Sequence, residues 1–296
     1  MKNWLAAFRL RTLPLALASI GMGAFLAAAS GAFNALVFGL CALTTILLQV
    51  LSNLANDYGD SIHGADSVER QGPSRAVQSG AISQEAMKQA IVIFVLLSLA
   101  SGIGLIYVAF GWMTFNFLLF LGIGALAIIA AITYTAGHKP YGYAGLGDIS
   151  VLVFFGFVAV MGSAYLYEGK LNWDYLLPAI SIGFFSVAVL NVNNIRDIES
   201  DVKAGKKSIP VRLGRAAAVR YHWFLLSVGF LSCVAYVSLN YNTYTQFLFV
   251  LTVPLLLVNA RAVKNKTTAA QLDPFLKQMA LSTLAFVVLF GLGQLL

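Results

Sequence analysis

The sequence has 296 residues, of which 59% are hydrophobic and only 10% are charged. Because a soluble globular domain carries roughly 25% charged residues, this composition excludes that class and indicates a protein embedded in a membrane. The formal net charge is +7, which by itself is compatible with a nucleic-acid partner. The placement of the charges along the chain, described below, excludes that interpretation and predicts no nucleic-acid binding.

Apolar stretches long enough to cross a bilayer, which takes about 20 helical residues, recur along the whole chain. We predict an all-α membrane protein, a single domain over residues 1–296 with about nine transmembrane helices. The predicted helices are 13–31, 34–56, 88–110, 113–135, 147–167, 174–195, 219–239, 244–262 and 277–296. Pro254 interrupts the eighth, where a membrane helix tolerates a kink. We expect no removable signal peptide, since no short apolar core with a small-residue cleavage site follows the first basic residues.

Cysteine and histidine are sparse and scattered. Cys41 and Cys233 lie in apolar runs, and His63, His138 and His222 are far apart in sequence. A cysteine in such a run is most simply a small packing residue. Because no Cys/His spacing typical of a metal ligand set occurs, we expect no zinc site.

Charged residues are sorted to one side of the membrane in the nine-helix arrangement. Of the 19 lysines and arginines, only Lys170 falls on the other side. Because these residues are enriched in cytoplasmic loops, we expect the N-terminus inside and the C-terminus outside. Of the 12 acidic residues, only Glu168 and Asp174 fall outside. A positive-inside bias does not require acids to gather there, so the acid-rich segments on this side are the candidates for function.

The first acid-rich segment reads NLANDYGDSIHGAD over residues 53–66 and closes the second predicted helix. Asn56 and Asp60 are four residues apart, so they share one helix face. We expect the following loop to fold Asp66 back toward that face. Asp57 lies about 100° round the helix from Asn56, which leaves its role open.

The second segment reads NNIRDIESD over residues 193–201 and closes the sixth predicted helix. Asn193, Asp197 and Asp201 are spaced four and four, which again predicts one helix face. Acids at the end of a membrane helix are costly and usually functional when they face the protein interior. For either segment alone, helix capping and loop solvation explain the acids about as well. Two such segments at equivalent places in a repeated pattern favour a function.

The equivalent places suggest an internal duplication. Predicted helices one to four and five to eight each carry an Asn/Asp segment after their second helix, so we expect pseudo-repeats over about 1–135 and 146–262, with a final helix 277–296. Two opposed carboxylate faces repel each other unless a cation lies between them. Carboxylate oxygens together with phosphate oxygens suit Mg²⁺, and the lysines and arginines that follow each segment can neutralise a diphosphate.

These paired motifs resemble the UbiA superfamily of intramembrane aromatic prenyltransferases, and the likeness extends over the whole chain. Three segments resemble the branch that prenylates 1,4-dihydroxy-2-naphthoate in menaquinone biosynthesis. They are residues 53–80, ending in RQGPSRAVQSG, residues 134–148, reading YTAGHKPYGYAGLGD, and residues 193–215, ending in IPVRLGR. The hydroxybenzoate branch differs from KPYGYAGLGD and has a shorter spacing than that from Asp60 to Asp66.

The resemblance implies Mg²⁺-dependent transfer of a polyprenyl group from polyprenyl diphosphate to 1,4-dihydroxy-2-naphthoate, with loss of CO₂, giving demethylmenaquinone. It also implies a bacterial inner membrane, a cytoplasmic active site and a central apolar cavity for the prenyl chain. The implied metal ligands are Asn56, Asp60, Asp66, Asn193, Asp197 and Asp201. The implied catalytic residues are Asp60, Asp197, Lys139 and Tyr134. The implied substrate-binding residues are Asn56, Asn193, Arg75, Tyr141, Asp148, Lys206 and Lys207.

Other interpretations stay open at this point. Each basic residue in these sets can equally be a charge that only fixes membrane orientation. The acceptor can be another aromatic compound, such as 4-hydroxybenzoate or a haem or chlorophyll precursor. A secondary transporter also has an internal repeat and buried acids, but its binding residues are expected near the bilayer midplane rather than at helix ends. A phosphatidyl-type transferase also clusters aspartates around metal, but without duplicated segments that begin with asparagine.

Overall fold

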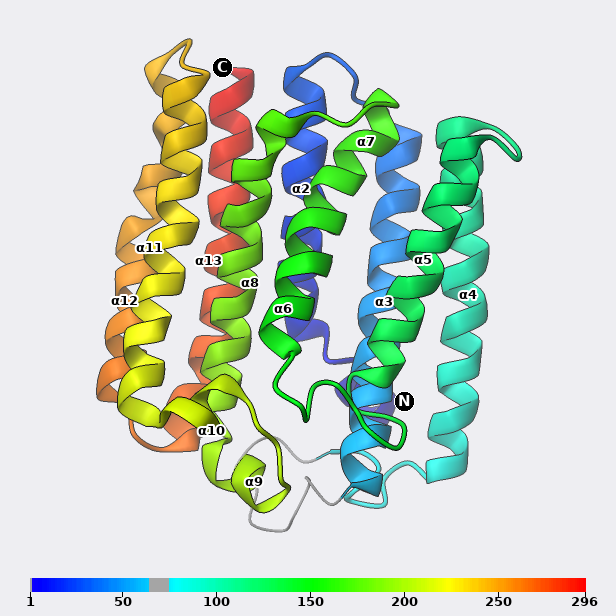
Figure 1. Ribbon diagram of the computed structural model, residues 1–296, viewed down its shortest axis with the longest axis vertical. Helices are drawn as coiled ribbons and strands as arrows, with labels where there is room; N and C mark the ends of the chain where they lie inside the picture. The colour runs from blue at the N-terminus through cyan, green and yellow to red at the C-terminus, as the bar shows by residue number, and fades with distance from the viewer. Residues whose placement is uncertain (1, 64–74) are drawn as a thin grey trace.

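The computed structural model describes residues 2–63 and 75–296, and these ranges contain helices and connecting loops but no strand. Within them, nine helical spans are long and apolar enough to cross a membrane, which confirms the number predicted from the sequence. The spans stand side by side in Figure 1 and are Lys2–Ala29, Ala35–Ile62, Gln84–Phe110, Phe115–Thr133, Gly147–Glu168, Trp173–Arg196, Arg215–Leu239, Tyr244–Asn265 and Ala269–Leu295.

The first span bends sharply before its membrane-crossing part begins. Its elements are α1 (Lys2–Phe8), the 3₁₀ turn η1 (Leu10–Thr12) and α2 (Leu13–Ala29). Between α1 and η1, Arg9 has a φ of 49°, in the left-handed region that residues with a side chain rarely adopt. Asn53 holds the bend, because its amide donates to the Phe8 carbonyl at 2.9 Å and to the Thr12 hydroxyl oxygen at 3.1 Å.

Several span boundaries differ from the sequence-based ones. The second span runs on to Ile62, so Asp60 lies inside its helix rather than beyond the predicted end at residue 56. The last span begins at Ala269, eight residues before the predicted start at 277. Pro254 occupies the first turn of an α-helix that follows a 3₁₀ stretch, so it starts a helix instead of kinking one.

The remaining elements follow in chain order. They are α3 (Ala35–Ile62), α4 (Gln84–Phe110), α5 (Phe115–Thr133), α6 (Gly147–Val151), η2 (Leu152–Gly162), α7 (Ser163–Glu168), η3 (Trp173–Tyr175), α8 (Leu176–Arg196), α9 (Ile198–Lys203), α10 (Ile209–Leu213), α11 (Arg215–Leu239), η4 (Tyr244–Thr252), α12 (Val253–Asn265) and α13 (Ala269–Leu295). The middle of the fifth span, η2, is wound as a π-helix. Such winding is rare and is frequently found at functional sites.

Two apolar clusters meet along α2. One packs α2, η2, α8, α11, η4 and α13 around large buried rings, and Phe185 and Phe249 each lie 5.0 Å from Phe286 between ring centroids. The other packs α2 against α3, α4, α5 and α7. Because α2 contributes to both clusters, it joins the two sides of the bundle. The internal duplication predicted from the sequence stays a prediction.

Helix α2 approaches the fifth span most closely at Gly23. A Cβ atom there would overlap the Ser163 hydroxyl and lie 2.5 Å from the carbonyl oxygen of Val160. Backbone atoms cannot move aside as a flexible side chain can, so this helix–helix contact requires a residue without a Cβ atom. Small residues have the same use at helix contacts in membranes generally.

We expect Gly23→Ala to lower the unfolding temperature of the protein in detergent, with a destabilisation of about 1–3 kcal/mol from overpacking. Gly39→Ala is the matched control, because Gly39 also lies inside a membrane helix but a Cβ atom added to it would meet no atom within 4 Å. Both changes favour the helix by about 1 kcal/mol. Thermal unfolding followed by tryptophan fluorescence measures the difference, and equal unfolding temperatures for the two variants would contradict the packing argument.

Candidate active site

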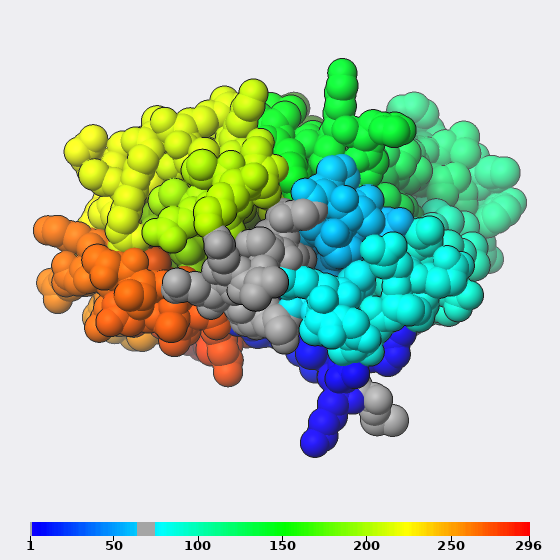
Figure 2. All heavy atoms as spheres, turned by 90° about the horizontal axis from the view of Figure 1, so that it is seen from below, coloured from blue at the N-terminus to red at the C-terminus, as the bar shows by residue number. Residues whose placement is uncertain are grey.

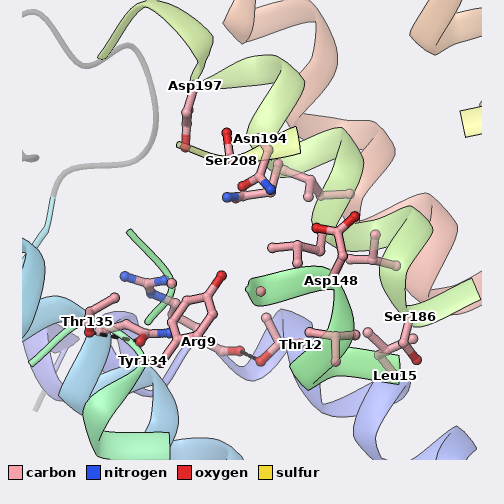
Figure 3. Close-up of a pocket in the computed structure, with 18 of the residues that line it drawn as sticks. Arg9, Thr12, Leu15, Tyr134, Thr135, Asp148, Ser186, Asn194, Asp197 and Ser208 are labelled. Carbon is pink, nitrogen blue, oxygen red and sulfur yellow. Dashed lines mark hydrogen bonds between the residues drawn. The ribbon is translucent and has the colours of Figure 1, made fainter. Parts of the chain in front are cut away.

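A polar pocket of about 220 Å³ lies at the end of the bundle that carries α9 and α10 (Figures 1 and 3). The predicted site residues in its lining are Asn56, Asp60, Arg75, Tyr134, Asp148, Asn193, Asp197, Asp201 and Lys206. In Figure 3, Tyr134 lies on one side of the pocket and Asp148 and Asn194 lie on the other. Figure 2 views this end of the molecule, where α9 (yellow-green) and the end of α3 (light blue) both reach the surface. The fold therefore brings the two Asn/Asp segments to one place.

Asp60 is buried near the end of α3 and is surrounded by donors. The Arg75 guanidinium lies 2.5 Å from Oδ2, the Tyr143 hydroxyl donates to Oδ1 at 2.9 Å, and the Lys206 ammonium lies 3.0 Å from Oδ1. Lys206 also lies 3.6 Å from Oδ1 of Asp201 and 4.8 Å from the centroid of the Tyr143 ring. One lysine thus joins the first Asn/Asp segment to the second.

The loop after α5 fixes the end of α3 by a close contact. The Thr135 hydroxyl donates to the carbonyl of Ala55 at 3.1 Å and to Oδ1 of Asn56 at 3.0 Å. Gly59 packs on the same residue, since a Cβ atom there would lie 2.5 Å from the carbonyl carbon of Thr135. This contact sets the rotation of α3, so that Asn56 and Asp60, one turn apart, both line the pocket.

Asp57, whose role the sequence leaves open, acts on the backbone beside the pocket. Its buried carboxylate accepts hydrogen bonds from the backbone N–H groups of Ala76 at 3.1 Å and Val77 at 3.4 Å. These bonds fix the turn that begins at Arg75, whose side chain reaches Asp60. Asp57 therefore positions a residue that lines the pocket.

The second segment is bent at Asp197 and does not form one continuous helix. Helix α8 ends at Arg196, and α9 begins at Ile198, with Asp197 at the junction. The i to i−4 backbone bonds continue across the bend, because the N–H of Asp197 donates to Asn193 at 3.1 Å and that of Asp201 donates to Asp197 at 2.8 Å. All three predicted side chains consequently stay in the lining of the pocket.

Arg196 binds the second segment from inside. Its side chain is buried, its Nε and Nη2 donate to the two carboxylate oxygens of Asp197 at 2.8 and 2.6 Å, and its Nη2 also donates to Oδ1 of Asn193 at 2.8 Å. Its Nη1 donates to Oδ1 of Asp273 on α13 at 2.6 Å. Asp273 in turn accepts from the Arg11 guanidinium at 3.0 Å.

Asp201 lies on the short helix α9 and is short of positive charge. Burial raises the pKa of its carboxyl to about 6, with Lys206 lowering this pKa and the neighbouring Asp197 and Asp60 raising it. Because two other carboxylates disfavour the ionised form of Asp201, a cation bound nearby would stabilise that form.

The aromatic and acidic residues of the middle loop lie around one corner of the pocket. Tyr134 and Tyr141 contact each other edge to face, with ring centroids 5.4 Å apart. Burial holds the pKa of Tyr134 well above its usual value, so its hydroxyl stays protonated and able to donate. Asp148 accepts a hydrogen bond from the Tyr221 hydroxyl at 2.9 Å.

Some predicted site residues lie apart from this pocket. Lys139 and Lys207 are exposed and are absent from its lining. Tyr141 is absent from it too and lines a second pocket instead, where its hydroxyl donates to the Ala130 carbonyl at 2.9 Å. Asp66 lies outside the described residues.

Other lining residues were not among the predicted site residues, although Thr135, Tyr143 and Ser208 lie in segments that carry the family resemblance. They include Arg9, Arg11, Thr135, Tyr143, Ser208 and Lys277. Arg9 and Arg11 come from the bend before α2, and Lys277 comes from α13. These residues are far in sequence from the two Asn/Asp segments, so the sequence does not place them at the site. Their positive charge is explained equally well by membrane orientation.

The second pocket, of about 390 Å³, extends from the first into the membrane-spanning part of the bundle. Its lining is mostly apolar and comes from α2, α3, α4, α5 and the fifth span. The side chains that line both pockets are Gln49, Asn56, Tyr134, Val151, Phe155 and Leu190. A polar chamber and an apolar chamber therefore share one wall.

The side-chain oxygens around the polar pocket can be compared with the ligands that Mg²⁺ usually takes in proteins. Within residues 2–63 and 75–296, no three acidic, histidine or cysteine side chains form a group that could hold a metal ion on their own. Mg²⁺, however, is usually bound by one or two carboxylates with water and substrate phosphate oxygens, not by an all-protein cage. The carboxylate and amide oxygens of Asp60, Asp197, Asp201, Asn56 and Asn193 around one pocket fit that pattern.

Comparison with known proteins assigns the chain to a family. The UbiA prenyltransferase family matches residues 16–288. The chain is 49% identical over 298 residues to the 1,4-dihydroxy-2-naphthoate octaprenyltransferase of Haemophilus influenzae, with 100% of this chain and 96% of that protein covered. It is 47% identical over 291 residues to the enzyme of the same name in Escherichia coli, with 98% and 94% covered.

Solved structures share the fold. A UbiA homolog from Aeropyrum pernix superposes with a TM-score of 0.69 at 17% identity, covering 97% of each chain. A UbiA homolog from Archaeoglobus fulgidus bound to GPP and Mg²⁺ superposes with a TM-score of 0.68 at 16% identity, covering 97% of this chain and 99% of that one. The family match over most of the sequence and the whole-length relatives confirm the resemblance seen in the motifs: the chain belongs to the UbiA prenyltransferase family.

Proposed function

We propose that this chain transfers a polyprenyl group from polyprenyl diphosphate to 1,4-dihydroxy-2-naphthoate, with loss of CO₂, to give demethylmenaquinone in its quinol form in a bacterial inner membrane. The observation that carries the proposal is the shared wall between a polar pocket lined by both Asn/Asp segments and an apolar pocket inside the bundle. An amphiphilic donor with a charged head and an apolar tail needs such a pair of chambers. The names of the two relatives supply the naphthoate acceptor.

The diphosphate is assigned to the polar pocket. Asn56, Asp60, Asn193, Asp197 and Asp201, with Asp66 from outside the described residues, would hold Mg²⁺ there. When bound, Mg²⁺ neutralises charge on the diphosphate as the allylic C–O bond breaks. Arg75 and Lys206 already lie at the pocket and are the cations best placed to stabilise the leaving diphosphate. For Lys139 and Lys207, which are exposed, a role requires movement toward the substrate.

The acceptor attacks near the wall between the chambers. The allylic carbon loses its bond to the diphosphate oxygen and forms a C–C bond to the ring carbon that bears the carboxylate. That carboxylate then leaves as CO₂, and its bonding electrons restore the aromatic ring. Tyr134 lines both pockets, so its ring can face the developing allylic cation and its hydroxyl can donate to a substrate oxygen. Asp148, which also lines the polar pocket, is assigned to an acceptor hydroxyl.

The prenyl chain is assigned to the apolar pocket. Phe154, Phe155 and Val158 of η2 line it together with apolar residues of α4 and α5. Burying the chain among such side chains contributes about 0.8 kcal/mol per CH₂ group removed from water. Tyr141, at the base of this pocket, would contact the first isoprene units of the chain.

An acceptor assay tests the reaction itself. Purified protein in detergent with Mg²⁺ and radiolabelled polyprenyl diphosphate is expected to form product with 1,4-dihydroxy-2-naphthoate and to release one CO₂ per product. Removal of Mg²⁺ with EDTA is expected to stop turnover, and added Mg²⁺ to restore it. Product with 4-hydroxybenzoate alone would overturn the assigned acceptor. No product with any aromatic acid would overturn the prenyltransferase proposal.

We expect Asp60→Asn and Asp197→Asn each to reduce kcat by about a hundredfold or more, since each removes a carboxylate that would hold the Mg²⁺ neutralising the leaving diphosphate. Asp174→Asn is the matched control, because Asp174 is exposed at the other end of the bundle. Expression level and elution on size-exclusion chromatography show whether a variant still folds. Near-normal turnover of both site variants would contradict the assignment of the two segments.

Membrane orientation has a separate test. The two native cysteines are buried, so a cysteine placed at Lys170 or at Lys207 is expected to dominate labelling in intact cells. A membrane-impermeant maleimide is expected to label Lys170→Cys from outside and to label Lys207→Cys only after the cells are broken. The reverse pattern would place the polar pocket on the outer side.

A further inference from the structure

The second Asn/Asp segment is held by a cation that belongs to the chain itself. Arg196 contacts both carboxylate oxygens of Asp197 and the amide oxygen of Asn193 through Nε and Nη2, all within 2.8 Å. Its side chain is only 1% exposed. These three oxygens belong to the residues to which the proposed function assigns Mg²⁺.

Arg196 and a divalent cation therefore compete for the same oxygens. Two positive centres on one carboxylate repel each other strongly where water is scarce. Metal uptake requires Arg196 to loosen its contacts with Asp197 and Asn193. A buried guanidinium that loses its carboxylate without another partner is strongly destabilising, so the exchange needs a second acceptor.

Asp273 is that second acceptor. Its Oδ1 accepts from Nη1 of Arg196 at 2.6 Å, and its Oδ2 accepts from Arg11 at 3.0 Å. Asp273 does not line the polar pocket. Asp273 lies in α13 and accepts from Nη1 of Arg196, whereas Asn193 accepts from Nη2. Its bond to Arg11 connects it to the bend before α2. The carboxylate is thus placed to keep Arg196 neutralised while Asp197 binds another cation.

We propose that Asp273 is a positioning residue that holds Arg196 when Asp197 releases it and thereby sets how readily the second Asn/Asp segment takes up a divalent cation. This inference rests on the proposed function. It assigns a role to a residue outside the pocket, on a helix that carries neither segment.

The test is Asp273→Asn, which keeps the shape of the side chain and removes its charge. Without that charge, Arg196 stays with Asp197 and metal binding weakens. Mn²⁺ binding to the purified full-length chain in detergent, followed by the electron paramagnetic resonance signal of free Mn²⁺, is expected to weaken about tenfold, a size typical of coupling between sites. The Mg²⁺ concentration for half-maximal prenyl transfer is expected to rise by the same factor, with kcat at saturating Mg²⁺ retained.

Two further variants separate this role from others. Glu199→Gln also removes one negative charge beside the second segment, but Glu199 is exposed, so its Mn²⁺ affinity is expected to change less than about twofold. Arg196→Lys keeps the positive charge but cannot bridge two carboxylates as the planar guanidinium does. In the Arg196→Lys background, Asp273→Asn is expected to have no further effect on Mn²⁺ affinity.

The outcomes are distinguishable from failure of the proposed function. Wild-type protein that transfers prenyl groups, together with an Asp273→Asn variant of unchanged Mn²⁺ affinity, overturns this inference alone. A lower unfolding temperature with unchanged Mn²⁺ affinity has the same consequence, because it makes Asp273 a structural brace. An equal effect of Glu199→Gln overturns it as well. Wild-type protein that neither binds Mn²⁺ nor transfers prenyl groups contradicts both.

Discussion

The site depends on how carboxylates at the ends of membrane helices are neutralised. A carboxylate removed from water is tolerated only when a counter-charge or hydrogen-bond donors accompany it. Here Lys206 spans from Asp60 of α3 to Asp201 of α9, so one side chain contacts a carboxylate of each segment and links helices that are far apart in sequence. The backbone follows the same connection, since the N–H of Lys207 donates to the Tyr143 carbonyl at 2.9 Å. Ion pairs within the chain itself therefore hold the two Asn/Asp segments together at the polar pocket.

The two segments meet this requirement in different ways. Asp60 receives its arginine from a loop, and that loop is fixed by hydrogen bonds to Asp57. Asp197 receives its arginine from the adjacent position in the chain, and Arg196 is shared with a helix at the other end of the sequence. Although the segments are similar as sequences, their environments are not interchangeable. The second segment is tied to α13, and the first is tied to the loop after α5 and, through Asn53, to the bend before α2.

Much of the fold could be predicted from sequence, because the bilayer sets the length of a spanning helix and the loop charges indicate which side of the membrane each loop lies on. The number of spans and the gathering of Asn56, Asp60, Asn193, Asp197 and Asp201 follow from these two rules and from helical spacing. The bend at Asp197 could not be predicted, because spacing alone assumes one continuous helix. Asp273 and Arg9 could not be identified either, since only tertiary packing brings them to the second segment and the pocket. Lys139 is exposed, although the resemblance of its loop implied a catalytic role, because a motif locates a loop more surely than it locates a side chain.

The wall shared by the two pockets has a consequence for where a bound prenyl diphosphate is placed along its length. Tyr134, Asn56 and Phe155 belong to both chambers, so the boundary between polar and apolar surroundings is formed by the turn after α5, by α3 and by the π-wound stretch of the fifth span. A donor anchored by its head at that boundary presents the same carbon to the acceptor whatever the length of its tail. The length of the prenyl chain is measured from its diphosphate end, and the chain would extend from there into the apolar pocket. With the donor bound as proposed, chemistry and chain length are decoupled, so changes deep in the apolar chamber would alter which homologue fits without moving the reacting atoms.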